Sequence, residues 1–81
     1  MKIEISDFIH VLKEEFEIPQ SVTFSSQTII ESVIEMSSIN ALIFLALIKT
    51  EYDVALTAGD LLHAKTVQEL YDIVVSKAIT E

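Results

Sequence analysis

The segment spanning residues 38–52 constrains the fold of this chain most strongly, because it is apolar nearly all round. It contains eight consecutive apolar residues, 41–48. If the segment is helical, its apolar side chains form two stripes on roughly opposite faces. One stripe consists of Ile39, Leu42, Ile43 and Ala46. The other consists of Phe44, Leu45, Ile48 and Tyr52. A helix with two apolar faces is either central to a fold or presents one face to another molecule.

The remaining periodic segments predict an all-α fold, arranged as one helical domain over residues 1–81. The chain has one Gly and one Pro, and its signals for strands are thin. Apolar residues at helical spacing predict a first helix from about Ile5 to Glu17. They also predict a last helix from about Val67 to Ala78, opened by a capping box at 66–69. We therefore expect a small four-helix bundle with three main helices and one short helix around Leu61 and Leu62.

A long connection from Gln20 to Ser37 separates the first two main helices. Its hydroxyl-bearing residues are typical of loops and caps, but apolar residues lie within it. These apolar residues are Ile29, Ile30, Val33 and Ile34. We expect them to lie against the core, with a short helical turn near residues 28–35. Connections of this length are uncommon and are often functional.

The charge balance excludes several classes of function. Acidic residues outnumber basic ones 13 to 5, the formal net charge is −8, and there is no arginine. Nucleic-acid binding requires a basic footprint, so it is not expected. The longest apolar run is far below the ~20 residues that span a bilayer, so no membrane insertion is expected. With no cysteine and no visible signal peptide, we expect a cytoplasmic protein. We also expect a monomer.

Candidate catalytic residues are few. His10 shares a polar helix face with Asp7 and Glu14, which indicates a solvated surface role. His63 is isolated in the short third segment, and two separate histidines without metal-ligand spacing do not predict a zinc site. The chain also lacks a glycine-rich phosphate loop. We therefore expect no catalysis by this chain alone.

Two serines, Ser37 and Ser38, stand directly before the apolar run. The start of a helix has unpaired backbone N–H groups and the positive end of the helix dipole, so it favours anions. A serine at this position either caps the helix or carries a phosphorylated group. The sequence by itself leaves both interpretations open.

The arrangement of these segments resembles the acyl carrier proteins, over nearly the whole chain. That family opens its second helix with an Asp-Ser-Leu motif, and residues 36–39 (Met-Ser-Ser-Ile) occupy this place. Residues 49–54 resemble the end of the family's second helix, and residues 65–70 resemble the start of its last helix. The resemblance implies a four-helix bundle of acyl-carrier type with 4'-phosphopantetheine attached covalently to Ser38. The family's aspartate is Ser37 here, and its upstream glycine is Glu35.

The resemblance also implies a set of partners: a phosphopantetheinyl transferase and the acyl-loading and acyl-accepting enzymes of fatty acid or polyketide biosynthesis. The second helix would be the surface that these partners recognise, and here it is more apolar and less acidic than in the family. The expected partner-recognition residues are Glu35, Met36, Ser37, Ile39, Ile43, Ala46 and Lys49. The inner residues Phe44, Leu45, Ile48, Leu61 and Leu62 would form ordinary core or also shelter the cargo.

Two other interpretations remain open at this stage. One is a helical adaptor that is never modified and binds a partner, or a second copy, through the apolar stripe of the second helix. The other is a degenerate carrier that keeps the fold and regulates a synthase. Two features support the adaptor: Ser37 in place of the family's aspartate, and an outward face of the second helix that is more apolar than a carrier needs. The carrier is the leading interpretation.

Overall fold

A computed structural model describes residues 3–79 of the chain. Its helices are α1 (Ile5–Glu15), a 3-10 turn η1 (Ile30–Ser32), α2 (Ser38–Tyr52), α3 (Ala58–His63) and α4 (Val67–Ile79). The only extended pairing in the described range is an isolated bridge between Ile29 and Thr66. The prediction of a small all-α fold with three main helices and one short helix is confirmed.

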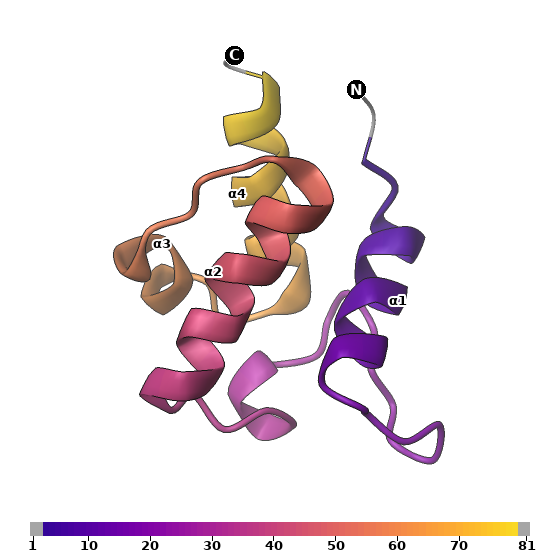
Figure 1. Ribbon diagram of the computed structural model, residues 1–81. Helices are drawn as coiled ribbons and strands as arrows, with labels where there is room; N and C mark the ends of the chain where they lie inside the picture. The colour runs from indigo at the N-terminus through magenta and orange to yellow at the C-terminus, as the bar shows by residue number, and fades with distance from the viewer. Residues whose placement is uncertain (1–2, 80–81) are drawn as a thin grey trace.

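Helix α2 lies at the centre of the arrangement, with α1 on one side and α3 on the other (Figure 1). Its inner face is fully buried at Phe44 and Ile48. The ring of Phe44 packs against Phe16, which follows α1, with 4.5 Å between the ring centroids. The observed limits of α2 are those expected from the sequence, because a capping serine precedes its first turn and Asp53 ends it in a left-handed conformation, with φ of 56°.

Helix α1 ends two residues earlier than the expected Glu17. Glu17 adopts a left-handed conformation with φ of 52°, which no α-helix can continue. The Ile18 N–H donates to the Lys13 carbonyl at 3.0 Å, and the Glu17 N–H donates to the Glu14 carbonyl at 3.3 Å. These two bonds form a Schellman motif, which satisfies carbonyl groups at the helix end.

The long connection before α2 is fastened to the start of α4 by backbone hydrogen bonds. The Val67 N–H donates to the Thr28 carbonyl at 3.0 Å, and the Gln68 N–H donates to the Ser26 carbonyl at 2.9 Å. The loop thus satisfies N–H groups that the first turn of α4 leaves free. Ile30 and Ile34 are buried as expected, with Ile30 only 1% exposed.

The expectation for Ile29 is wrong. Its side chain is 56% exposed, because the backbone at this residue pairs with Thr66 in an extended bridge. Ile29 is extended, whereas Ile30 begins the 3-10 turn η1 and is buried there. Of the neighbouring pair, Ile30 takes the inner side and Ile29 the outer.

Two capping boxes start the last two helices. At α4, the Glu69 N–H donates to the Thr66 hydroxyl at 3.1 Å, and the Thr66 N–H donates back to the Glu69 carboxylate at 3.1 Å. This is the predicted box. At α3, Thr57 and Asp60 make the same reciprocal pair. Each box satisfies two backbone donors that would otherwise lack a partner.

The Glu69 box predicts a pH dependence of stability. The Lys65 and Thr66 N–H groups hold the pKa of Glu69 below its ordinary value of 4.5. A lowered folded-state pKa stabilises the fold above the unfolded-state value, and this stabilisation is lost as pH falls through the folded-state pKa. We expect the unfolding free energy of Glu69→Gln to fall less steeply than that of the wild type as pH drops below about 4.5. Urea denaturation at several pH values measures both slopes, and equal slopes would contradict the role given to this carboxylate.

Two tyrosines flank Phe8 in the core, and their hydroxyl groups differ. The ring centroids of Tyr52 and Tyr71 lie 5.8 and 5.6 Å from that of Phe8. The Tyr71 hydroxyl donates to the Ile3 carbonyl. The Tyr52 hydroxyl is buried without a hydrogen-bond partner among residues 3–79, and this burial is the main cause that raises its pKa.

This difference predicts opposite outcomes for one substitution at two sites. Tyr71→Phe removes a hydrogen bond and is expected to lower the free energy of unfolding by about 1 kcal/mol. Tyr52→Phe removes an unsatisfied hydroxyl and is expected to leave stability unchanged or raise it. Urea denaturation at neutral pH compares the two variants. A loss at Tyr52 as large as that at Tyr71 would show that the Tyr52 hydroxyl has a partner.

Candidate functional site

The two serines before α2 have different structural roles. Ser37 is the N-cap residue, with extended backbone, and its hydroxyl accepts a hydrogen bond from the Asn40 N–H at 3.1 Å. Ser38 is the first residue of the helix. The capping function therefore belongs to Ser37.

The Ser38 side chain is exposed. Within residues 3–79 its hydroxyl makes no hydrogen bond and takes no part in capping. It stands in the first turn of α2, where backbone N–H groups lack intrahelical acceptors. That turn contains no acidic residue. The surroundings of this hydroxyl are therefore open to solvent and positively polarised.

A side-chain hydrogen bond fixes the approach of the loop to this serine. The Asn40 side-chain amide donates to the Glu35 carbonyl at 2.7 Å, across the start of the helix. Met36, between them, is half-buried and packs against the core. Glu35 is exposed, and Ser37 is half-buried. Sequence reasoning missed Asn40, since nothing in its spacing identifies the carbonyl that it binds.

The outward face of α2 is apolar near Ser38 and charged further along. Ile39 is 71% exposed and Leu42 is 65% exposed, and Ala46 is also exposed, while Ile43 is half-buried. Lys49 donates to the Asp53 carboxylate at 2.8 Å, so these two charges offset each other. The hydrogen bond from Lys49 is the main cause that lowers the pKa of Asp53.

The inner stripe of α2 lies in the hydrophobic core, but Leu62, which was expected beside it, does not. Phe44 and Ile48 are fully buried, Leu61 is 3% exposed, and Leu45 is half-buried. Leu62, in contrast, is 70% exposed. Leu61 and Leu62 are adjacent on the short helix α3, so when one faces the core the other turns about 100° away. The expectation that Leu62 lines an interior space is wrong.

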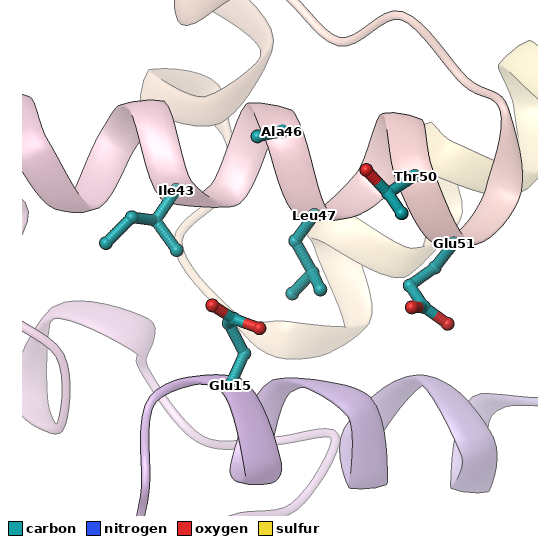
Figure 2. A pocket seen from close by; sticks show the side chains of 6 residues that line it. All are labelled: Glu15, Ile43, Ala46, Leu47, Thr50 and Glu51. Carbon is teal, nitrogen blue, oxygen red and sulfur yellow. The ribbon is translucent and has the colours of Figure 1, made fainter.

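A groove lies between α1 and the part of α2 that runs from Ile43 to Glu51 (Figure 2). It has a volume of about 260 Å³, and its lining residues are Glu15, Ile43, Ala46, Leu47, Thr50 and Glu51. In Figure 2 the Glu15 side chain rises from α1 toward α2, and Ile43 and Leu47 point down from α2 toward α1. The groove shares Ile43 and Ala46 with the predicted recognition surface. Glu15 was not predicted, because its position beside α2 depends on how α1 and α2 pack.

The two histidines hold surface positions. The His10 ring lies 3.3 Å from the Glu14 carboxylate, and both side chains are exposed, in agreement with the expected surface position of His10. His63 is exposed, and its Nδ1 lies 2.8 Å from the Gly59 carbonyl. Across the described residues, no three His, Asp or Glu side chains are placed to hold a metal ion. No helix within residues 3–79 has the length and apolar character needed to cross a bilayer.

Comparisons of the chain with protein families, with curated proteins and with solved structures found no match.

Proposed function

We propose that this chain is a carrier of the acyl carrier type, which holds an acyl or similar group on phosphopantetheine attached to Ser38 and presents it to partner enzymes. The observation that carries the proposal is the division of roles between two serines. Ser37 caps α2 through its bond from Asn40 at 3.1 Å, and the Ser38 hydroxyl is exposed with no structural task. A group can therefore be attached at Ser38 without loss of the helix cap.

The residues at this site fit a phosphate ester. An added phosphate would be attached in the first turn of α2, where free N–H groups and the helix dipole favour negative charge. The absence of acidic residues from that turn removes local repulsion. When bound, the phosphopantetheine group supplies a terminal thiol that holds an acyl group as a thioester.

The chain's own residues present and position the attachment point. Ser37 fixes where the helix begins, and Asn40 ties the preceding loop to the first turn through the Glu35 carbonyl. Ile39 and Leu42 form an exposed apolar surface directly beside Ser38. The partners that follow from this proposal are a phosphopantetheinyl transferase and the enzymes that load and accept the acyl group.

Mass spectrometry of the intact protein tests the proposal. The full chain is incubated with coenzyme A and a broad-specificity phosphopantetheinyl transferase, and its mass is expected to rise by one phosphopantetheine. An established carrier serves as the positive control for each transferase. No gain with several active transferases would contradict the proposal.

A second candidate function is an unmodified adaptor. It is favoured by the exposure of Ile39 and Leu42, 71% and 65%, because large apolar side chains in contact with water are stabilised when a partner covers them. For an adaptor that pairs with itself, light scattering would show a mass that rises with concentration, and Leu42→Asp would return it to the monomer. A carrier is expected to remain monomeric and to gain mass with coenzyme A.

A further inference from the structure

The segment that joins η1 to α2 has few backbone hydrogen bonds. The last one before it is donated by the Ile34 N–H at 2.8 Å, and the first one after it is accepted by the Ser37 carbonyl at 2.9 Å. Between these two bonds, Glu35 and Met36 make no backbone–backbone hydrogen bond with any residue in the range 3–79. A segment with so few bonds changes conformation easily unless side chains hold it in place.

The side chain of Asn40 supplies the missing connection. Its amide donates to the Glu35 carbonyl at 2.7 Å, while the Asn40 backbone N–H donates to the Ser37 hydroxyl at 3.1 Å. Asn40 is half-buried, and a hydrogen bond that is partly shielded from water is stronger than one in open solvent. One residue of α2 therefore fastens both ends of the segment 35–37.

The position of this segment bears on the attachment of a group at Ser38. In loading, the Ser38 hydroxyl oxygen attacks the phosphorus of coenzyme A that carries pantetheine. A P–O bond forms to the serine and the pyrophosphate P–O bond breaks, so that adenosine bisphosphate leaves and the hydroxyl proton passes to a base of the transferase. Such an attack needs the oxygen aligned at about 3–3.5 Å from the phosphorus. The segment 35–37 lies directly before Ser38, so its displacement would shift or cover this oxygen.

We propose that Asn40 is a positioning residue for loading, which holds the segment 35–37 in the arrangement that presents the Ser38 hydroxyl to a transferase. The proposal rests on the carrier function proposed above. Asn40 acts through the segment and does not touch the reacting atoms. Without its side chain, only a fraction of the molecules has the competent arrangement. The apparent affinity for the transferase falls by that fraction, while the rate at saturation stays the same.

The loading kinetics of Asn40→Ala test this role. Alanine keeps the backbone N–H that donates to Ser37 and suits a helix, so the variant is expected to fold. With coenzyme A saturating and the carrier concentration varied, we expect the KM for the carrier to rise about fivefold, as the loss of one hydrogen bond implies. We expect kcat to change less than twofold.

NMR relaxation of the unloaded protein gives a second readout. The backbone order parameters of residues 35–37 are expected to fall in Asn40→Ala, because these residues lose the bond to the Glu35 carbonyl. Those of residues 42–50, within α2, are expected to stay at their wild-type values.

Gln68→Ala is the matched control. Gln68 is also a half-buried residue in the first turn of a helix, and its side-chain amide donates to the Asp72 carboxylate at 2.8 Å. Its KM is expected to stay within twofold of the wild type. An unchanged KM for Asn40→Ala, a fall confined to kcat, an equal rise for Gln68→Ala, or unchanged order parameters at 35–37 would overturn this inference alone. A wild type that gains no mass with coenzyme A would overturn the proposed function, and this inference with it.

Discussion

Ser38→Ala is expected to abolish the gain in mass that coenzyme A and a transferase produce, with no loss of stability. The hydroxyl is exposed and makes no hydrogen bond within residues 3–79, so its removal leaves every described contact in place. Alanine is also a good residue for a first helical turn. The expected effect on loading is complete, while the change in unfolding free energy stays within about 0.5 kcal/mol.

The neighbouring variant, Ser37→Ala, provides the matched control. It removes the cap that accepts from the Asn40 N–H, which is expected to cost about 1 kcal/mol of stability. The Ser38 hydroxyl remains, so the mass gain is expected to persist, at a lower rate. Intact mass measures loading, and urea denaturation measures stability. If Ser37→Ala abolished loading and Ser38→Ala did not, the attachment site would be Ser37, and the roles that we assign to the two serines would be wrong.

Phe44→Ala is expected to have the largest effect on the fold. The side chain is fully buried in the central helix and packs against Phe16 at 4.5 Å. Removing a buried phenylalanine ring loses its transfer free energy and leaves a cavity, with a typical cost of 3–5 kcal/mol. That cost is a large part of the roughly 5–15 kcal/mol that stabilises a domain. We expect a much lower urea midpoint or an unfolded chain.

Leu42→Ala is the control for this substitution on the same helix. Leu42 is 65% exposed, and alanine suits a helix interior, so the change in unfolding free energy is expected to stay within about 0.5 kcal/mol. Urea denaturation compares the two variants with the wild type. Similar losses at both positions would mean that the outward face of α2 is buried, and would contradict the exposure described for that face.

Much of the fold followed from the sequence, because local signals determine it. The start of α2 follows from Ser37 and Ser38, and its extent from its apolar run. The start of α4 follows from the box formed by Thr66 and Glu69. The Thr57 and Asp60 box of α3 is a signal of the same kind, a capping pair three residues apart. Signals of this kind act within a few residues and need no knowledge of the tertiary structure.

The errors concern apolar residues that stand next to each other. Helical or extended spacing cannot tell which of Ile29 and Ile30, or of Leu61 and Leu62, faces the core when both are apolar. The tertiary contacts decide, and they place Ile29 and Leu62 outward at 56% and 70% exposure. For the same reason the groove between α1 and α2 was not predicted, since Glu15 and Leu47 meet only once two distant helices are packed.

Peptide mapping identifies the serine that carries the added group. After incubation with coenzyme A and a transferase, the protein is digested, and fragmentation of the peptide that contains residues 37 and 38 shows which serine carries the group. We expect phosphopantetheine on Ser38 alone, with Ser37 unmodified. Attachment to Ser37, or an unmodified peptide under conditions that load an established carrier, would contradict it.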